Sequence, residues 1–295
     1  MEKLNFFLKE KASGQNAAIF MSGSGTNAEK VLEHVFKRDK KAWNPSAIVT
    51  DAPKKSRASE IALKYNIPLI EHDIKQFYKA RGEKRISLFT ETGRKIRQEW
   101  TDELRKKLFP FQLDFGILAG FIPLTNITAD FPCLNVHPGD LTVEQEGKRL
   151  LVGLHTLPIE TAIINGRNEL RSSVIIAQKY TGKGGEMDTG PILGISTPVQ
   201  IDYMGFSLSE LKIVAGKRAV QRPFGGYKDI LENVAKHNQE CLKREGDWIV
   251  LPRAVNDFAL NNFAVDEAGK LYYRQKNVWN AVNTVVYCKN IIKTV

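Results

Sequence analysis

The residues of this sequence best suited to chemistry lie in one short run, Leu134-Asn-Val-His-Pro138, at the end of an apolar stretch. Asn135 and His137 are two residues apart, so on an extended strand both side chains point to the same side. An asparagine amide can donate a hydrogen bond to a developing oxyanion, and a histidine can carry protons near neutral pH. The pair therefore suits a reaction in which an oxygen gains negative charge while a proton moves. A histidine that only caps the turn before Pro138 would give the same pattern.

A second candidate is a glycine-rich turn between an apolar run and an amphipathic one, Met21-Ser-Gly-Ser-Gly-Thr-Asn27. Glycine lets the backbone approach a ligand closely, and the free amides at a helix start favour a phosphate group. The sequence is neither a P-loop nor a dinucleotide fingerprint. We therefore expect either a phosphate site or a tight structural turn. The residues concerned, called the glycine turn below, are Gly23, Ser24, Gly25, Thr26 and Asn27.

A third candidate is Asp188, in the run Met187-Asp-Thr-Gly-Pro-Ile-Leu193. An aspartate beside glycine in a turn is usually only a turn former. Taken alone, Asp188 predicts no chemistry.

The elements that must position these residues follow from the hydrophobic pattern of the first two hundred residues. Short apolar runs alternate with amphipathic stretches, which predicts an open, Rossmann-like, mostly parallel sheet with helices on both faces. Such sheets bind ligands at the carboxyl ends of their strands. Strands are expected at Ala17–Met21, Ala47–Thr50, Pro68–Ile70, Asp114–Ala119, Cys133–Val136 and Ser172–Gln178. Helices are expected after the glycine turn, capped by Thr26 or Asn27, at Ser56–Tyr65, within the basic segment Lys79–Lys107 and at Thr156–Asn165.

The pattern changes beyond about residue 200. Helices are expected at Ser207–Val220 and Gly226–Gly246, the second ended by the glycine. From Trp248 on, the apolar runs WIVLP, FAV and LYYR are divided by polar turns, which predicts a small strand-rich appendage. We therefore expect a catalytic domain at residues 1–200 and an α+β extension, packed on it, at residues 201–295.

The composition indicates a soluble cytoplasmic protein. The 295 residues are 42% hydrophobic and 26% charged, without a membrane-length apolar run or a secretory signal. Three scattered cysteines without a CxxC pair predict neither disulfides nor structural zinc. The net charge of +10 attracts anionic partners. The basic segment Lys79–Lys107 is interpreted as the solvated face of amphipathic helices, whose apolar stripe is Ile86, Leu88, Phe89, Ile96, Trp100 and Leu104.

Taken in their order along the chain, the motifs of this sequence resemble those of the folate-dependent formyltransferases, most closely the glycinamide ribonucleotide formyltransferases of purine synthesis. The resemblance runs from about Ala17 to Val199. It rests on IFMSGSGTN, LAGF (Leu118–Phe121), LNVHP, GLHT (Gly153–Thr156) and MDTGPIL. It implies transfer of a formyl group from 10-formyltetrahydrofolate to the amine of a small phosphorylated substrate, with glycinamide ribonucleotide as the expected acceptor.

The resemblance also implies roles for residues. Asn135 and protonated His137 would stabilise the tetrahedral oxyanion. Asp188 would orient His137 and help to move the amine proton to the leaving nitrogen, and the glycine turn would hold the substrate phosphate. No metal is required. Residues that bind the folate are expected at Leu118, Phe121, Leu124, Thr125 and Leu134.

The sequence departs from the family pattern at several places that leave the acceptor open. The loops at residues 139–152 and 180–187 are longer, and Ile122-Pro-Leu-Thr125 lacks the arginine that commonly follows LAGF. Alternatives are a formyltransferase acting on an amino sugar or a tRNA, and a formyltetrahydrofolate hydrolase. A nucleic-acid-binding protein on an inactive formyltransferase fold is the non-enzymatic alternative, which the intact Asn135, His137 and Asp188 disfavour. Neither a membrane nor nucleic acid is the expected partner, and a homodimer stays open.

Overall fold

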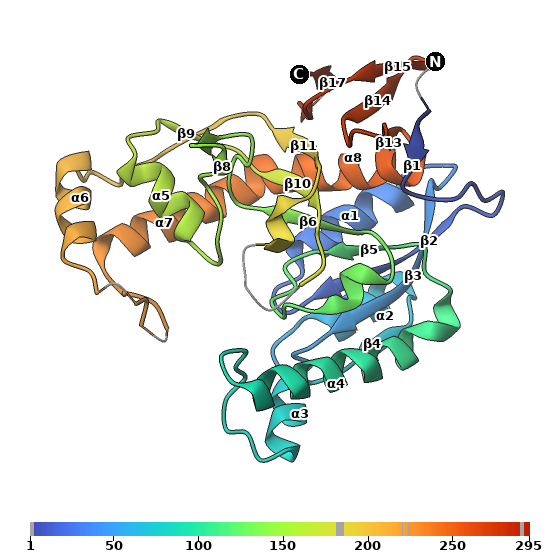
Figure 1. Cartoon of the computed structure of the whole chain (residues 1–295), viewed down its shortest axis with the longest axis horizontal. Helices are drawn as coiled ribbons and strands as arrows, with labels where there is room; N and C mark the ends of the chain where they lie inside the picture. The colour runs from blue at the N-terminus through green and yellow to red at the C-terminus, as the bar shows by residue number, and fades with distance from the viewer. Residues whose placement is uncertain (1–2, 181–185, 220, 224, 290–291) are drawn as a thin grey trace. The chain divides into compact units, whose positions relative to one another are not determined.

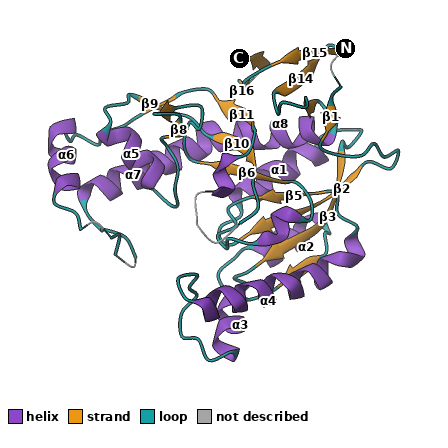
Figure 2. Cartoon of the chain, viewed as in Figure 1, coloured by secondary structure: helices purple, strands orange, loops and turns teal. Residues whose placement is uncertain are grey.

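A computed structural model of the chain describes residues 3–180, 186–219, 221–223, 225–289 and 292–295 (Figures 1 and 2). The chain forms two compact units. Unit 1 comprises Met1–Val136, Ile175–Pro191 and Leu251–Asn283, and unit 2 comprises His137–Val174, Ile192–Val250 and Thr284–Val295. The division at residue 200 predicted from the sequence is not a boundary between these units, because each contains residues from both sides of it.

Unit 1 is built on a parallel sheet. Its central strand β2 (Gln15–Met21) pairs with β3 (Trp43–Thr50) on one side and with β5 (Phe115–Leu118) on the other. The sheet continues from β3 to β4 (Leu69–Glu71) and from β5 to β6 (Cys133–His137). The predicted parallel α/β fold is confirmed, and all five of these strands were expected to within a few residues.

Helices cover both faces of this sheet, because side chains alternate along β2. Ala18 and Phe20 face Trp100 and Leu104 of α4 (Glu91–Leu108) in one buried cluster. On the other face, Phe115 of β5 packs edge-on against Phe258 of α8 (Trp248–Ala259), with ring centroids 5.6 Å apart. Further helices of unit 1 include α1 (Thr26–Phe36), α2 (Ala58–Tyr65), α3 (Ile74–Ala80) and the short turns η1 (Phe109–Phe111) and η2 (Asn126–Ala129).

Two local expectations for unit 1 are wrong. Neither Thr26 nor Asn27 caps α1; the N-cap is Gly25, in a left-handed conformation without a side-chain hydrogen bond. The expected apolar stripe of the basic segment is also too long, since Phe89 is 93% exposed. It lies in the loop before α4, whose first turn is capped by Thr90. The buried stripe is therefore limited to residues of the helix itself.

Unit 1 also contains a small antiparallel sheet, as the sequence suggested for FAV and LYYR. Strand β13 (Phe263–Val265) pairs with β14 (Leu271–Gln275) and with β1 (Asn5–Phe6), and β14 pairs with β15 (Val278–Ala281). The run WIVLP is not a strand, because it begins α8. The residues Val250, Leu251, Ala254, Val255 and Phe258 are all buried at helical spacing.

Unit 2 combines helices with short strands. Helices α5 (Leu157–Ile164), α6 (Leu208–Gly216) and α7 (Ile230–Leu242) share a buried apolar cluster. Instead of ending at Gly246, the helical course continues from α7 through one π-turn, η4 (Lys243–Asp247). The strand β11 (Ile192–Ser196) pairs in parallel with β16 (Val285–Tyr287), which pairs with β17 (Ile292–Thr294). Two short pairs are β9 (Glu169–Leu170) with β12 (Val199–Gln200) and β7 (Glu144–Gln145) with β8 (Lys148–Arg149).

Strand β10 (Ser173–Ile176) begins in unit 2 and ends in unit 1. Among the described residues, no helix is both long and apolar enough to cross a membrane.

Candidate active site

The strand β6 ends in the two residues first singled out for chemistry. Asn135 is half-buried, and His137 is 3% exposed. The His137 Nε2 lies 2.7 Å from the carbonyl oxygen of Leu151. Because a carbonyl only accepts, this nitrogen carries a hydrogen and donates it, which fixes the orientation of the ring. The histidine is therefore held in one orientation within unit 2.

The loop after His137 is held by two hydrogen bonds to Ser173, the first residue of β10 (Ser173–Ile176). The Ser173 hydroxyl donates to the carbonyl of Gly139 at 2.8 Å and accepts from the amide of Leu141 at 3.0 Å. A Cβ at Gly139 would stand 2.7 Å from the Leu151 carbonyl, so only glycine fits there. The start of the long loop 139–152 thus lies directly against the carbonyl that accepts from His137.

Asp188 lies in unit 1, on the short turn η3 (Glu186–Thr189). The amide of Gln178 donates to the carbonyl of Met187 at 3.0 Å, and the amide of Ala177 donates to the carbonyl of Cys133 at 2.8 Å. A Cβ at Gly190 would meet the Ile176 carbonyl at 1.9 Å, so the turn requires glycine there. Unit 1 therefore ties the turn that carries Asp188 to the beginning of β6. The rest of the long loop, residues 181–185, lies outside the described residues.

The glycine turn follows β2 and starts α1. Gly25 has φ +67°, and its carbonyl accepts the first helical hydrogen bond, from Glu29, at 2.9 Å. The Arg57 amide donates to the Gly23 carbonyl at 3.1 Å, and its guanidinium donates to the Ser24 carbonyl at 3.1 Å. Arg57, the N-cap of α2, thus holds two carbonyls of the turn. No atom lies within 4 Å of a Cβ built on Gly23, so the turn is open on that side.

The five residues expected to bind the folate differ in burial, and some of them belong to the hydrophobic core. Leu134 is fully buried inside β6 and Leu118 is 4% exposed at the end of β5, so both are core residues. Phe121 packs edge-on against Phe20 and stacks on Trp100, with ring centroids 5.4 and 6.3 Å apart. Leu124 and Thr125 follow in the loop that leads to η2. Of the five, Thr125 lines a cavity.

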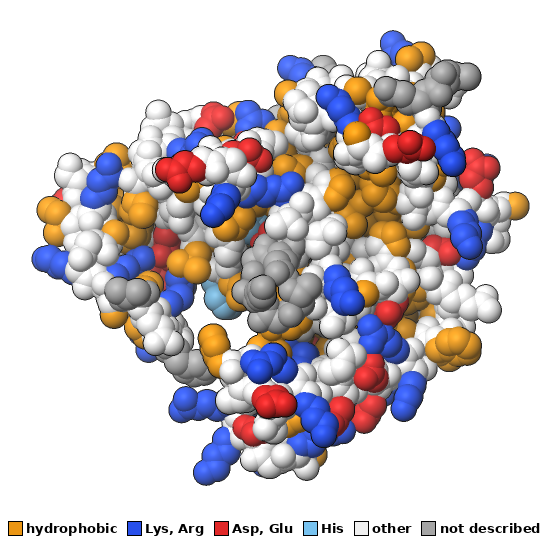
Figure 3. Space-filling model, in the orientation of Figure 1, with side chains coloured by type: hydrophobic (Ala, Val, Ile, Leu, Met, Phe, Trp, Pro, Cys, Tyr) orange, Lys and Arg blue, Asp and Glu red, His pale blue; other side chains and the backbone are white. Residues whose placement is uncertain are grey.

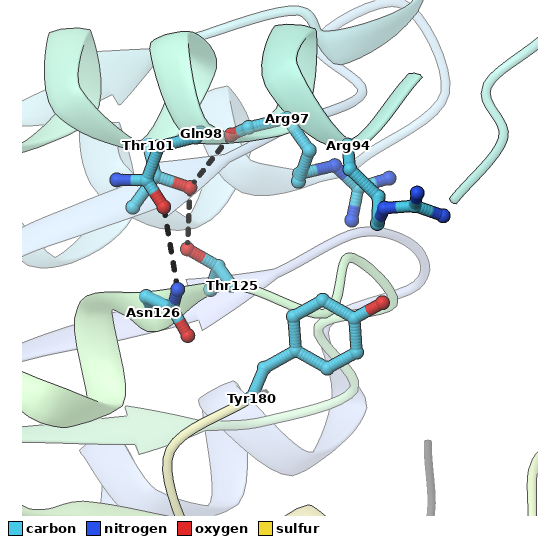
Figure 4. A pocket seen from close by; sticks show the side chains of 7 residues that line it. All are labelled: Arg94, Arg97, Gln98, Thr101, Thr125, Asn126 and Tyr180. Atoms are coloured by element: carbon cyan, nitrogen blue, oxygen red, sulfur yellow. Dashed lines mark hydrogen bonds between the residues drawn. The ribbon is translucent and has the colours of Figure 1, made fainter. Parts of the chain in front are cut away.

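That cavity has a volume of about 170 Å³ and lies between α4 and the loop that carries Thr125 (Figure 4). The Arg97 side chain is 6% exposed, and one of its terminal nitrogens donates to the Leu124 carbonyl at 2.6 Å. Among the described residues, the Nε of Arg97 and the Oδ1 of Asn126 are buried without a hydrogen-bond partner. The cavity is cationic, because two arginines, Arg94 and Arg97, line it. Its lining is Arg94, Arg97, Gln98, Thr101, Thr125, Asn126 and Tyr180.

Sequence reasoning missed the two arginines, because it assigned the whole basic segment to a solvated face. The signal was there: Arg94 and Arg97 are three apart, and Thr101 follows four residues later, so all three share one helix face. The rest of the segment does behave as a solvated face. Arg81 pairs with Glu99 and Glu103, and lysine and arginine side chains alternate with acidic ones over the region of α3 and α4 (Figure 3).

A buried ion network in unit 2 was also missed. Arg218 pairs with Glu160 and with Asp229, and Arg222 pairs with Glu160 and with Glu232. Glu160 and Glu232 are 3% and 2% exposed, so their charges require these partners. The network ties the chain between α6 and α7 to the start of both α5 and α7. Arg218 and Arg222 are 58 and 62 positions from Glu160 in the sequence, so a local sequence pattern cannot connect them.

No protein-family model matches this sequence, and no curated protein matches it either. Solved structures do resemble it. The phosphoribosylglycinamide formyltransferase of Coxiella burnetii is 15% identical, with a TM-score of 0.59, over 93% of this chain and 100% of its own. That of Anaplasma phagocytophilum is 15% identical, with a TM-score of 0.55, over 92% and 97%. A formyltetrahydrofolate deformylase of Pseudomonas syringae is 12% identical, with a TM-score of 0.55, over 88% of this chain and 66% of its own.

The structural match extends further than the sequence resemblance, which ended at Val199. Because it covers 93% of the chain, it includes much of the segment after residue 200. The chain has the fold of the folate-dependent formyltransferases.

Proposed function

We propose that this protein transfers the formyl group of 10-formyltetrahydrofolate to the amine of a small phosphorylated substrate, with glycinamide ribonucleotide as the acceptor. One observation carries the proposal: a formyltransferase fold whose strand β6 ends in Asn135 and His137, spaced so that both side chains leave the strand on the same side. On this proposal the protein works in the cytoplasm, in purine biosynthesis.

The reaction begins when the substrate amine attacks the formyl carbon on N10 of the folate. The carbonyl oxygen becomes an oxyanion in the tetrahedral intermediate. The Asn135 amide and protonated His137 donate to that oxygen, a role whose loss typically slows an enzyme about 100- to 1,000-fold. Asp188 orients His137 and accepts the amine proton, directly or through water, and N10 leaves as that proton reaches it. The fixed ring of His137, held by Leu151, suits this role.

The glycine turn suits the substrate phosphate. Its amides stand at the N-terminus of α1, where the helix dipole favours an anion. Open space in front of Gly23 admits a ligand close to the backbone. A phosphorylated amine is therefore the acceptor class that we propose.

The cationic cavity suits the folate. Folates carry a glutamate tail with at least two carboxylates, and arginine binds carboxylates through paired hydrogen bonds. Arg94 and Arg97 line the cavity together with Thr125, a residue expected to contact the folate. We therefore assign the cavity to the anionic tail of the folate.

Hydrolysis of formyltetrahydrofolate is the second candidate, favoured by the structural match to the Pseudomonas syringae deformylase. In that reaction water takes the place of the amine. The two candidates share the folate and the oxyanion, so they differ only in what attacks the formyl carbon.

The deciding experiment supplies 10-formyltetrahydrofolate to the purified protein with a panel of acceptors: glycinamide ribonucleotide, its dephosphorylated riboside, a phosphorylated amino sugar and water alone. Release of tetrahydrofolate and appearance of the formylated amine are both measured. We expect both with glycinamide ribonucleotide and neither with the riboside. Release without any acceptor would identify a hydrolase, and no release with any of them would reject the proposal.

A further inference from the structure

The ends of three neighbouring strands in unit 1 are joined through one serine hydroxyl. Ser22 follows β2, directly before the glycine turn, and is 6% exposed. Its hydroxyl accepts a hydrogen bond from the Ile122 amide at 2.9 Å and donates one to the Asp51 carboxylate at 2.5 Å. Its backbone amide donates to the Gly120 carbonyl at 3.2 Å. Ser22 therefore contacts the loops after both β3 and β5.

The loops that meet here are the ones with proposed ligands. On one side Ser22 is covalently continuous with the glycine turn, Gly23–Asn27. On the other side it holds residues 120–125, here called the LAGF loop, which lead to the cavity. The hydroxyl donates to the loop after β3 and accepts from the LAGF loop, so a single side chain holds both loops.

The partner of Ser22 is itself fixed. Asp51 is 7% exposed, and its backbone carbonyl accepts from the Ile74 amide at 3.1 Å, at the start of α3. Its carboxylate accepts a hydrogen bond from the Ser22 hydroxyl, which leaves the lone pairs of the serine oxygen to accept from the Ile122 amide. The order of the contacts is thus from Asp51 through the hydroxyl to the LAGF loop.

We propose that Ser22 is a positioning residue that couples the glycine turn to the LAGF loop, so that an anion bound at the first restrains the second. The role of ligands in this coupling rests on the proposed function: the acceptor phosphate would organise the folate-binding loop before the formyl group arrives. The mechanical coupling itself needs no ligand, because it is a property of three strand ends.

Hydrogen exchange of the whole chain tests the coupling, followed by mass spectrometry of peptides that cover residues 22–27 and 119–125. Ser22→Ala leaves the Ile122 amide without its acceptor. Exchange in both peptides should then accelerate about tenfold or more, as expected for the loss of a buried hydrogen bond. Ser22→Thr keeps the hydroxyl and should restore slow exchange. Ser87→Ala is the matched control, since that hydroxyl also accepts a loop amide, from Phe89 at 3.2 Å; neither peptide should change.

Should Ser22→Ala not fold, Asp51→Ala replaces it, because it frees the hydroxyl to rotate and should loosen the same two peptides to a lesser degree. Acceleration limited to residues 22–27, or absent from both peptides, overturns the coupling. In a second arm, inorganic phosphate should slow exchange in both peptides of the wild type and only in residues 22–27 of Ser22→Ala. If phosphate protects neither peptide of the wild type, the proposed phosphate site fails, while the ligand-free comparison still decides the coupling.

Discussion

At the scale of single residues, the two glycines of the glycine turn have different reasons to be glycine. Gly25 has φ +67°, and a Cβ there would stand 2.4 Å from both the Met21 Cε and the Ile61 Cδ1. Gly23 has neither restriction. We expect Gly25→Ala to lower the free energy of unfolding by about 1–2 kcal/mol. Gly23→Ala should leave stability unchanged and weaken phosphate binding, because its methyl group enters the open space in front of the turn.

Thermal unfolding and a phosphate titration of the two variants check this expectation. Equal phosphate affinity in the wild type and in Gly23→Ala would show that the turn is only structural.

Asp51 makes stability depend on pH. Burial raises the pKa of its carboxyl above the usual value, although the Ser22 hydrogen bond and the charge of Arg97 oppose the increase. The folded chain therefore binds this proton more tightly than the unfolded chain. Stability from this group is present below the unfolded pKa and is lost as pH rises through the raised folded pKa. Asp51→Asn cannot titrate and still offers Ser22 an oxygen.

The stability advantage of Asp51→Asn over the wild type should accordingly grow as pH rises from acid toward neutral. Denaturant unfolding of both proteins across that range measures it. A difference between the two proteins that does not change with pH would mean that Asp51 titrates alike in the folded and unfolded chains.

The sequence revealed some of these residues and not others. Asn135 and His137 stand out because two-residue spacing on a strand is a local property. The contact between Ser22 and Asp51 joins positions 29 apart, and Arg97 differs from its neighbours only by the helix face it occupies. Pairings of that kind depend on which strands become neighbours, so they follow from the fold and not from a motif.

At the scale of elements, the segment after Gly246 shows how a strand-like composition can form a helix. Trp248-Ile-Val-Leu-Pro252 is rich in β-branched residues, and proline disfavours a helix interior. Its buried positions nevertheless recur at helical spacing through Phe258. Gly246 does not end the helix but lies in a π-turn where a Cβ would meet the Ser172 hydroxyl at 2.6 Å. Tertiary packing therefore overrides the local preference of this run.

Helix α4 supplies the positive charge of the cavity, and the role of Arg97 in folate binding can be tested with an arginine outside the cavity as the control. Arg97→Met should raise the KM for 10-formyltetrahydrofolate by about tenfold or more, since hydrogen bonds to charged groups contribute about 1.5–3 kcal/mol. The kcat should change little. Arg81→Met is the control, because Arg81 pairs with Glu99 and Glu103 and is not among the residues that line this cavity. Steady-state kinetics of both variants check the assignment; equal folate KM values would remove Arg97 from folate binding.

At the scale of the whole molecule, the order of strands along the chain was predictable and the grouping of segments was not. The alternation of apolar and amphipathic runs indicated a parallel sheet with helices on both faces, and the structure confirms it. The expected extension at residues 201–295 instead divides between the two units, and its residues 251–283 join the first 136 residues in unit 1. That grouping depends on contacts such as Phe258 with Phe115 and with Phe7, which are distant in sequence.

The last part of the chain should therefore be needed for the stability of unit 1. Phe258 is 1% exposed, and we expect Phe258→Ala to lower the free energy of unfolding by about 3–5 kcal/mol through the cavity it leaves. Leu260→Ala, at a side chain that is 45% exposed, should cost less than about 1 kcal/mol. Denaturant unfolding compares the two. Similar small losses would show that α8 contributes little to the core.

The most direct test of the account is the formyl-transfer rate of His137→Asn. This histidine is proposed to act on charge that appears only in the transition state, so its loss should lower kcat about 100- to 1,000-fold and leave both KM values nearly unchanged. His237→Asn is the control, because His237 is partly exposed and pairs with Asp202; it should keep the wild-type rate. A His137→Asn protein that folds and transfers formyl groups at the wild-type rate would contradict the assignment of the active site to β6.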